Sequence, residues 1–383
     1  MSRSSHPELV HFALAVGGFA IGTTEFATMS LLPYFSRDLG ISAPVAGHVI
    51  SAYALGVVLG APLIAVLAAK LSRRTLLIGL MVLFALANGL TGLAPSYHAM
   101  MALRFISGLP HGAYFGVAML VAASLVPTEM RAQAAARVLM GLTVATIIGV
   151  PCAEWLGIAI GWRWCFAIVA AISLLTATLV ALFAPRQPPA EGASPLTELG
   201  ALQNKHVWLT LAIGAIGFGG LFSVYTYLAT TLLDVTHVDP DIVPLVFAVF
   251  GAGMTAGLVT VPRFAHRGLV KTAGWLLVWS AVMLALYTFA ATNIWTIMLA
   301  VFAIGLGGAL GPVLQTRLMD VAGDAQTLAA ALNHSAFNVA NALGPLLAGF
   351  AIAAGYGVQS SGLVGAGLAL AGLGVWAVAR SAR

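Results

Sequence analysis

The side chains best able to carry chemistry in this chain are ionisable groups set inside long apolar runs. Glu25 lies in the stretch AIGTTEFATMSLLP, with no basic residue nearby in the sequence. A charged side chain at the centre of a lipid bilayer costs on the order of 3 kcal/mol or more, and such residues usually serve a function. Helical spacing puts Gly18, Gly22, Glu25 and Met29 on one face, where the two glycines let a helix or a ligand approach closely.

Glu25 therefore has two interpretations. In the functional one it faces a central cavity and binds either a proton or a cationic substrate. Poor solvation favours a neutral carboxyl group, and a nearby cation favours a charged one. Such competition is what an exchanger of protons for substrate requires. In the structural interpretation, Glu25 is neutral and hydrogen-bonded to a neighbouring helix. We expect the functional role.

Arg104 and His111 lie seven residues apart, which places them on one face of another apolar segment. Arginine keeps its charge in proteins and needs an acceptor. Glu25, Glu154 and backbone carbonyls are the candidates. A histidine can change its charge near neutral pH or act as a neutral hydrogen-bonding ring. Glu154 lies near the end of its segment, where it can titrate or only extend toward the membrane surface.

A polar stripe and several large side chains are candidates for contact with a substrate. His334, Asn338 and Asn341 share one helical face within NHSAFNVANALGP. A polar stripe in a membrane-spanning helix usually faces protein or water, so this one either lines a cavity or holds helices together. Aromatic and methionine side chains suit varied, mostly apolar ligands. Beside Glu25 and His111, the further candidates are Met29, Tyr53, Tyr114, Phe222, Tyr225 and Gln315.

The composition restricts the class of protein. The chain has 383 residues, of which 60% are hydrophobic and only 8% are charged, whereas a soluble domain has about 25% charged residues. So few charges cannot cover a water-soluble surface, and we expect a polytopic membrane protein. Cys152 and Cys165 fit no metal or disulfide pattern. The sequence has no phosphate-binding glycine-rich loop and no paired metal-ligand histidines, so we expect no cofactor and no ATP drive.

Apolar runs of about 20 residues, the length that spans a bilayer, follow one another along the chain. We expect twelve spans, at 9–34, 43–69, 75–94, 98–123, 133–158, 162–184, 206–233, 242–262, 270–290, 294–317, 326–350 and 358–379. The first run has no clear small-residue cleavage site, so it is interpreted as a retained span. The polar stretch APRQPPAEGASPLTELGALQNK divides the spans into two sets of six. The expected all-helical organisation is a six-helix bundle over 1–184, a cytoplasmic linker over 185–205 and a second six-helix bundle over 206–383.

Lysine and arginine indicate the orientation. With both termini in the cytoplasm, fourteen of the 17 basic residues fall on the cytoplasmic side, Arg37 and Arg163 fall outside, and Arg104 lies within a span. An excess of basic residues in cytoplasmic loops is the usual pattern of membrane proteins. The net charge of +5 is therefore a topology signal and not a nucleic-acid-binding surface.

The two sets of spans resemble each other weakly. SGLPHGA aligns with IGLGGAL, and VATIIGVP aligns with VANALGP, at a nearly constant offset. Parallel repeats of this kind place a substrate site at the bilayer midplane between two halves, which rock to give alternating access. In this alignment Glu25 matches Val224 and His111 matches Gly308. The titratable groups therefore belong to the first half only.

Several segments resemble the twelve-span drug:proton antiporter branch of the major facilitator superfamily. GTTEFATMSLLP resembles its first-span signature, ALRFISGLPHGAYFGV its fourth-span motif with the embedded Arg104, and GLTVATIIGVPCAEWLG its fifth-span motif. HVISAYALGVVLGAPL is closest to arabinose-efflux and chloramphenicol-exporter permeases. The resemblance covers the whole chain and implies two pseudo-symmetric six-helix bundles. It also implies that the Arg104 region takes part in proton coupling, beside Glu25, His111 and Glu154.

The fifth-span motif implies a hinge and an ion seal between the halves, built from Gly141, Gly149, Pro151 and Gly157. Taken without the resemblance, these residues predict close helix packing and a bend.

One departure from the family pattern concerns the loop between spans two and three. The stretch AVLAAKLSRRTLL keeps Lys70, Arg73 and Arg74, but Ala69 and Ser72 stand where the family has an acidic residue and a glycine. The basic cluster is therefore either a gate, as in the family, or only a topology anchor near anionic lipid.

These features predict a secondary transporter, and not an enzyme, that exports drug-like or amphipathic small molecules across the bacterial inner membrane in exchange for protons. Its partners would be the substrate, protons and the lipid bilayer, and the family expectation is a monomer. A sugar-efflux permease and a uniporter or symporter of the same fold are the alternatives. A membrane-embedded enzyme is disfavoured, because the sequence has no cluster of polar catalytic groups near one interface.

Overall fold

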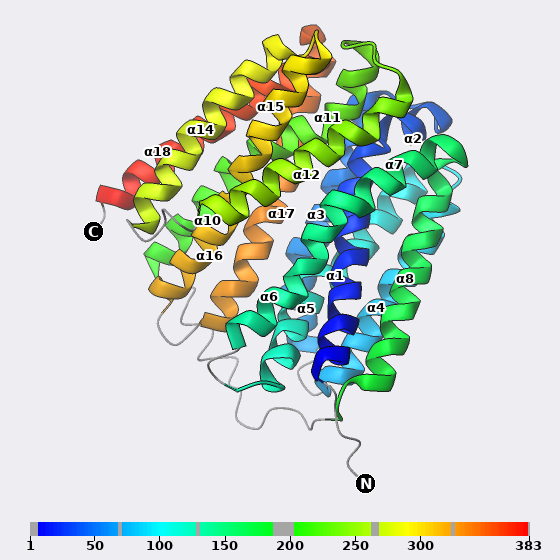
Figure 1. Cartoon of the computed structure of the whole chain (residues 1–383), viewed down its shortest axis with the longest axis vertical. Helices are drawn as coiled ribbons and strands as arrows, with labels where there is room; N and C mark the ends of the chain where they lie inside the picture. Colours follow the sequence, from blue (N-terminus) through cyan, green and yellow to red (C-terminus); the bar gives the residue numbers. More distant parts are fainter. Residues whose placement is uncertain are drawn as a thin grey trace.

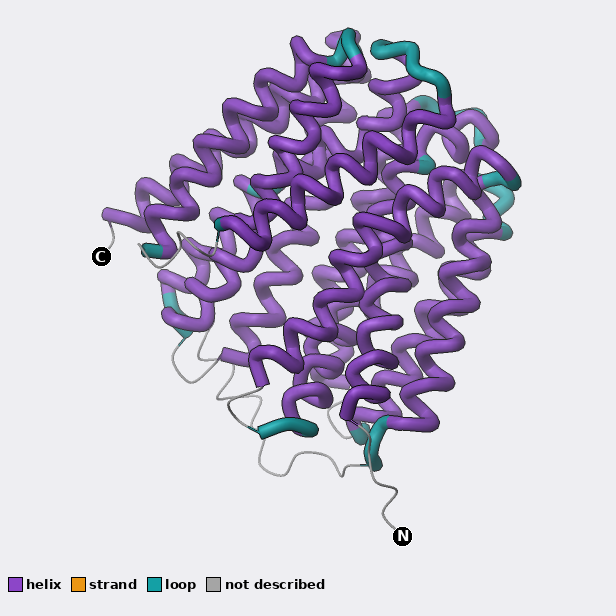
Figure 2. Tube along the Cα trace, viewed as in Figure 1, coloured by secondary structure: helices purple, strands orange, loops and turns teal. Residues whose placement is uncertain are grey.

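The structure is a computed structural model that describes residues 7–67, 71–127, 131–186, 203–261, 268–322 and 326–381. Over these residues the chain is helical, with loops only at the turns and no strand (Figure 2). Within the described residues, 12 helical segments are long and apolar enough to cross a membrane. The expected all-helical, twelve-span fold is confirmed.

The spans of the first half run from α1 to α8. Their elements are α1 (Pro7–Ser30), α2 (Leu32–Asp38), α3 (Ala43–Leu67), α4 (Arg73–Gly92), α5 (Tyr97–Ser124), α6 (Arg131–Val144), the π-helical turn η2 (Ala145–Gly149), α7 (Val150–Ala159) and α8 (Trp162–Phe183). The second half has α10 (Lys205–Gly217), α11 (Gly219–Asp234), η4 (Pro240–Ile242), α12 (Val243–Thr260), α14 (Leu269–Ala290), α15 (Ile294–Leu306), η5 (Gly307–Ala309), α16 (Leu310–Val321), α17 (Gln326–Ala351), η6 (Ile352–Tyr356), η7 (Val358–Ser360) and α18 (Ser361–Ser381).

The predicted spans agree with these helices within a few residues, and the main differences are breaks. The predicted span 9–34 ends earlier, at Ser30, because α2 begins as a separate helix with Pro33 in its first turn. Proline fits there, since the first turn of a helix does not need its N–H groups. The seventh span breaks at Phe218, between α10 and α11. Of the predicted linker, residues 187–202 lie outside the described residues.

The helices form two groups that lie side by side, α1 to α8 and α10 to α18 (Figure 1). At their boundary α3 packs along α17, and α1 packs along α11. Tyr227 fills the space beside Gly47, and its hydroxyl donates to the Pro345 carbonyl at 3.1 Å. The Ser51 hydroxyl donates to the Ala342 carbonyl at 3.0 Å. These contacts hold the two halves together along α3 and α17.

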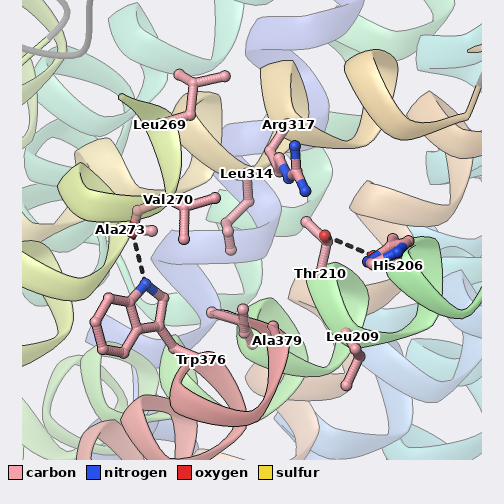
Figure 3. A pocket seen from close by; sticks show the side chains of 11 residues that line it. His206, Leu209, Thr210, Leu269, Val270, Ala273, Leu314, Arg317, Trp376 and Ala379 are labelled. Carbon is pink, nitrogen blue, oxygen red and sulfur yellow. Dashed lines mark hydrogen bonds between the residues drawn. The ribbon is translucent and has the colours of Figure 1, made fainter. Parts of the chain in front are cut away.

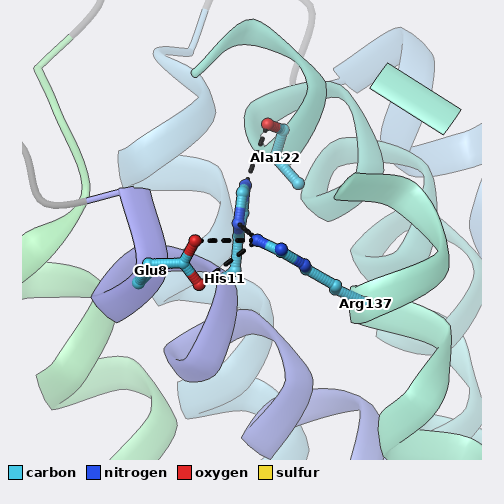
Figure 4. Close-up of polar contacts among 4 residues, drawn as sticks. All are labelled: Glu8, His11, Ala122 and Arg137. Atoms are coloured by element: carbon cyan, nitrogen blue, oxygen red, sulfur yellow. Dashed lines mark hydrogen bonds and ion pairs between the residues drawn. The ribbon is translucent and has the colours of Figure 1, made fainter. Parts of the chain in front are cut away.

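Twelve crossings return the chain to the side on which it began. We call that side the terminal end and the opposite side the distal end. At the terminal end Arg137 of α6 pairs with Glu8 of α1 at 3.0 Å and approaches Nδ1 of His11 at 3.4 Å (Figure 4). Nε2 of His11 lies 3.1 Å from the Ala122 carbonyl of α5. A guanidinium only donates, so Nδ1 accepts and Nε2 carries the hydrogen bonded to Ala122. The His11 ring thus joins α1, α5 and α6.

At the distal end α2 is tied to the start of α8. Asp38 accepts hydrogen bonds from the Arg163 guanidinium and from the Trp162 indole, the latter at 3.2 Å. The hydrogen bond from Arg163 holds the pKa of Asp38 below its usual value. Because α2 follows α1 directly, this contact fixes the distal end of α1 within the first half.

Candidate functional site

Glu25 lies at the boundary between the halves, within α1. Its side chain is buried, with 7% of its surface exposed. Oε1 accepts a hydrogen bond from Nδ2 of Asn341 in α17 at 3.1 Å, across 316 residues of sequence. The polar stripe predicted in α17 therefore meets Glu25 directly.

Arg104, in α5, is fully buried and is held by neutral groups. Its Nη1 donates to Oγ1 of Thr24 at 3.2 Å and to Oδ1 of Asn88 at 3.4 Å, and it lies 3.5 Å from Oγ of Ser107. The Thr24 hydroxyl in turn donates to Oδ1 of Asn88 at 2.8 Å. Nε and Nη2 make no hydrogen bond to the described residues. The acceptors are therefore side chains of α1, α4 and α5, and not the carboxylates or backbone carbonyls that we expected.

The charge of Arg104 acts on Glu25 without an ion pair between them in the described part of the chain. The two groups are close enough for their charges to interact. Burial opposes the charged form of a carboxyl group, and a nearby guanidinium favours it. Glu25 is thus subject to two opposing effects, which is the condition under which a small change of surroundings changes its charge.

A row of rings leads from Arg104 to the second half. The guanidinium lies over the Tyr53 ring, 4.2 Å from its centroid. The Tyr53 hydroxyl lies 2.9 Å from Nδ1 of His111, whose ring packs against Phe115 at a centroid distance of 5.4 Å. Phe115 stacks on His334 of α17 at 5.6 Å. The structure thus brings the predicted residues Tyr53, His111 and His334 into one row across the boundary.

Aromatic side chains join α1 to α11 beside Glu25. The Phe26 ring stacks on Phe222 at 6.2 Å and meets the edge of Tyr225 at 5.4 Å. Tyr225 also packs against Phe250 of α12 at 4.6 Å. Met29, one turn farther along α1, is fully buried in the same apolar cluster. Rings grouped near a carboxyl group suit an apolar or cationic ligand.

Tyr114 is directed into the first half and away from this boundary. Its hydroxyl donates to the Leu14 carbonyl at 2.8 Å, and its ring fills the space beside Gly17. Both neighbours belong to α1, so the contacts of Tyr114 are those of packing within one bundle. The predicted substrate contact at Tyr114 has no support from this geometry.

The remaining polar candidates of the second half have partners within that half. Oε1 of Gln315 accepts from Asn333 at 2.5 Å. Asn338 donates to the His334 carbonyl at 2.9 Å, and its buried Oδ1 is without a partner in the described residues. Oδ1 of Asn341 is likewise unpaired. Two amide oxygens of α17 are therefore available as acceptors.

Glu154 lies apart from Glu25, in α7 toward the distal end. It is completely buried, and neither carboxyl oxygen has a hydrogen bond of standard geometry to the described residues. The hydroxyls of Ser30 and Tyr34 lie beside it. The alternative in which Glu154 only extends to the membrane surface is therefore wrong.

The predicted glycine stripe of span five packs inside the first half. A Cβ added at Gly141 or Gly149 would collide with α1, and one at Gly157 would collide with Leu31, just after α1. Small residues here allow close approach of neighbouring helices. The nearest neighbours of all three glycines thus belong to the first half, and the hinge and seal that the resemblance implies stay a prediction.

A neighbouring turn of the same span does meet the second half. A Cβ at Gly251 of α12 would collide with the Thr146 carbonyl in η2. Pro151 follows this π-helical turn within α7. Proline displaces the carbonyl four residues earlier, and a wider turn accommodates this. Pro151 thus follows a π-helical turn at the boundary, and the bend that it predicts stays a prediction.

The basic cluster after span two has a structural role in the described residues. Arg74 donates to the Ala181 carbonyl near the end of α8, where cations are favourable. Ser72 is the N-cap of α4 and accepts from the Thr75 N–H at 3.2 Å. Arg73 begins α4, and Lys70 lies outside the described residues. The gating role predicted for these three basic residues stays a prediction.

A pocket at the terminal end of the second half is separate from this site. It lies among α10, α14, α16 and α18, has a volume of about 20 Å³, and is lined by groups that include His206, Arg317 and Trp376 (Figure 3). The Trp376 indole donates to the Val270 carbonyl at 2.6 Å. A space of this size suits a water molecule and not a drug-sized ligand.

Sequence reasoning did not select four residues that complete the site: Thr24, Phe26, Asn88 and Phe115. Thr24 and Phe26 flank Glu25, and neighbours of a buried carboxyl group are natural candidates. Asn88 is a strongly polar side chain within the apolar span FALANGL, which is the signal that would have found it. Phe115 carries no signal, because one more phenylalanine in an apolar helix is ordinary.

The fold defines a polytopic helical membrane protein with a buried ionisable site between two groups of helices. The chain belongs to the Major Facilitator Superfamily, whose family model matches residues 14–270 and 207–383. It is therefore a membrane transporter of this superfamily and not an enzyme.

Three curated relatives span most of the chain. Inner membrane transport protein YdhP of Escherichia coli (strain K12) is 41% identical over 365 residues, covering 94% of this chain and 93% of that protein. The chloramphenicol resistance protein of Streptomyces lividans is 35% identical, covering 88% and 87%. A probable sugar efflux transporter of Pasteurella multocida is 30% identical, covering 95% and 90%.

The fold is also that of solved transporters. A bacterial homologue of the human lysosomal transporter Spinster, in an inward-facing and occupied conformation, matches with a TM-score of 0.78 at 17% identity. The match covers 100% of this chain and 98% of that one. At this identity the similarity concerns the fold alone.

Proposed function

We propose that the protein exports amphipathic, drug-like small molecules across the bacterial inner membrane in exchange for protons, as a monomer with both termini in the cytoplasm. The observation that carries the proposal is the buried hydrogen bond between Glu25 and Asn341, which joins the halves beside Arg104. The relatives named for chloramphenicol resistance and inner membrane transport support the substrate class and the location.

In this mechanism the proton and the substrate compete for Glu25. A charged carboxylate attracts a cationic or polarised substrate, and protonation removes that attraction. A hydrogen bond to an ionised acceptor is roughly twice as strong as one to a neutral acceptor. The charge of Glu25 therefore also changes the strength of its bond to Asn341 in the other half. One proton thereby affects both the affinity for substrate and the contact between the halves.

Sugar efflux is the second candidate function. The unpaired Oδ1 atoms of Asn338 and Asn341 can accept hydrogen bonds from hydroxyl groups, which suits a sugar. A relative named as a probable sugar efflux transporter supports the same alternative. The aromatic rings around Phe26 favour the amphipathic ligand as the first candidate.

The test is transport by purified protein in proteoliposomes with chloramphenicol and arabinose as separate probes. With an imposed pH gradient, the protein should accumulate chloramphenicol uphill. Glu25→Gln should abolish uphill movement while leaving the protein folded, because the amide has nearly the same shape and cannot release a proton. Glu8→Gln, at a peripheral ion pair, is the matched control and should retain transport.

Each outcome distinguishes the candidates. If the Glu25→Gln protein still drives uphill transport under a pH gradient, the proposed role of Glu25 is wrong. If the protein moves arabinose uphill but not chloramphenicol, sugar efflux replaces the export of drug-like molecules as the proposed function.

A further inference from the structure

The carboxyl group of Glu154 is a buried group that could hold a proton, and it is separate from the exchange of proton and substrate at Glu25. It is 0% exposed, and Oε1 and Oε2 both lack a hydrogen-bond partner in the described residues. An isolated ionised carboxylate in an apolar interior is very costly, whereas its protonated form is tolerated. A group that carries its proton in the interior and has no structural partner is suited to passing that proton on.

On its distal side Glu154 is connected to the surface through Tyr34. The Tyr34 hydroxyl lies beside the carboxyl group and is itself buried without a hydrogen-bond partner in the described part of the chain. The charges of Arg37 and Asp241, both at the distal surface, reach the same hydroxyl. Arg37 is 66% exposed in its side chain, so this end of the path meets solvent.

On its inner side, Tyr225 lies within range of the charges of both Glu154 and Glu25. The Tyr225 hydroxyl responds to the charges of both carboxyl groups, and the Tyr225 ring packs against Phe26 with a centroid distance of 5.4 Å. Ser30, beside Glu154, is five residues after Glu25 in the same helix, which is roughly 7 Å along the axis at 1.5 Å per residue. Glu154 therefore lies beside the helix that carries Glu25, about one and a half turns farther along.

The other polar group that faces Glu154 is already engaged. Cys165 of α8 lies close enough to respond to the charge of Glu154. Its thiol donates to the Ala153 carbonyl at 3.0 Å, so it does not take part in the path. Tyr34, Glu154 and Tyr225 remain as candidate steps between the distal surface and Glu25.

We propose that Glu154 is a proton-relay residue that receives protons from the distal side through Tyr34 and delivers them to Glu25 through Tyr225. In the delivery step the O–H bond of Glu154 breaks and the Tyr225 oxygen accepts that proton. Tyr225 gives its own proton to the Glu25 carboxylate, where a new O–H bond forms. The Glu154 carboxylate is then protonated again by external water through Tyr34. This inference rests on the proposed function, including its orientation.

The first experiment needs no substrate. Infrared difference spectra of the reconstituted protein, recorded between acidic and alkaline pH, report the carbonyl bands of protonated carboxyl groups. Glu154→Gln should remove one buried carboxylic-acid band, Glu25→Gln should remove another, and Tyr34→Phe should retain both. If Glu154→Gln removes no such band, Glu154 does not carry a proton and the proposal is overturned.

The second experiment measures delivery. Under a pH gradient, chloramphenicol-driven proton uptake by the Glu154→Gln protein should slow by about 100-fold or more, which is the range typical of a positioned proton donor. Exchange of labelled for unlabelled chloramphenicol at equal pH should be unchanged, because it needs no net proton transfer. Glu154→Asp should restore most of the rate, and Tyr34→Phe should slow it without affecting folding.

The two proposals fail in different ways. If Glu25→Gln abolishes coupling while Glu154→Gln transports protons at the normal rate, the relay is wrong and the proposed function stands. If Glu25→Gln leaves coupling intact, the proposed function is wrong whatever Glu154 does. An equal loss of exchange and proton uptake in Glu154→Gln indicates a structural role and overturns the relay.

Discussion

At the scale of single residues, the charged groups of the site are positioned by neutral polar neighbours. Asn88 is the clearest case, since its Oδ1 accepts from both Thr24 and Arg104 while its Nδ2 donates to the Phe84 carbonyl at 2.8 Å. Ser107 interacts less with the arginine, because its hydroxyl lies 3.5 Å from Nη1 of Arg104 and already donates to the Arg104 carbonyl in its own helix. Asn88 therefore holds the arginine together with Thr24, to which it is also bonded.

This difference gives a matched pair of variants. Asn88→Ala should lower the free energy of unfolding by about 1–3 kcal/mol, because a buried charged donor loses its acceptor. Ser107→Ala should cost clearly less. Thermal unfolding in one detergent, followed by the chloramphenicol assay, compares them. Equal losses would show that Asn88 has no special part in holding Arg104.

The sequence indicated candidate site residues, but it did not indicate which of them lie in contact with one another. Glu25 and Asn341 were both selected, each by its polarity within an apolar span, yet nothing in their spacing predicts a contact across 316 residues. That contact depends on how two halves pack, which periodicity does not encode. Tyr114 was selected in the same way, and its position in a candidate span did not predict its direction toward α1.

At the scale of helices, the glycine stripe of span five is explained by packing. Gly149 faces Thr23 and Phe19 of α1, with no room for a Cβ. Both residues belong to the same half as Gly149. The geometry thus favours a role in holding α1 and η2 together, whereas gating by this stripe remains a prediction.

Gly149→Leu separates these roles. Overpacking a filled contact typically costs about 1–3 kcal/mol, so we expect a lower melting temperature and a parallel loss of transport. The control is Gly116→Leu in α5, where a Cβ would have no neighbour within 4 Å. Loss of transport with a normal melting temperature in Gly149→Leu would instead support gating.

At the scale of the whole molecule, hydropathy alone predicted the number of spans, because bilayer thickness fixes the length of an apolar helix. The breaks at Ser30 and Phe218 were not predicted, since a short interruption hardly changes the average hydropathy. The internal repeat anticipated two similar sets of helices but not their contact along α3 and α17.

The orientation is a prediction at this scale. In the predicted topology, fourteen of the 17 basic residues fall on one side, and such a bias normally marks the cytoplasm. A green fluorescent protein fused to the C-terminus should therefore fluoresce. Alkaline phosphatase fused after Pro95, between α4 and α5, should be active because that loop would be external. The reverse pattern of activities would invert the orientation and the proposed direction of proton flow.

The π-helical turn η2 determines the direction in which the side chains after it point in span five. Gly141 and Gly149 are eight residues apart, while two α-helical turns take about 7.2 residues. The excess would rotate the second glycine by about 80°, but a π turn absorbs about one residue. Val150 bonds to the Ala145 carbonyl in that manner, and both glycines face α1. Between Gly149 and Gly157 there is no π turn to absorb the extra residue, and Gly157 faces Leu31. Because the π turn already absorbs the extra residue, removing one residue from η2 would restore an ordinary α-helical turn and leave Glu154 pointing at Tyr34.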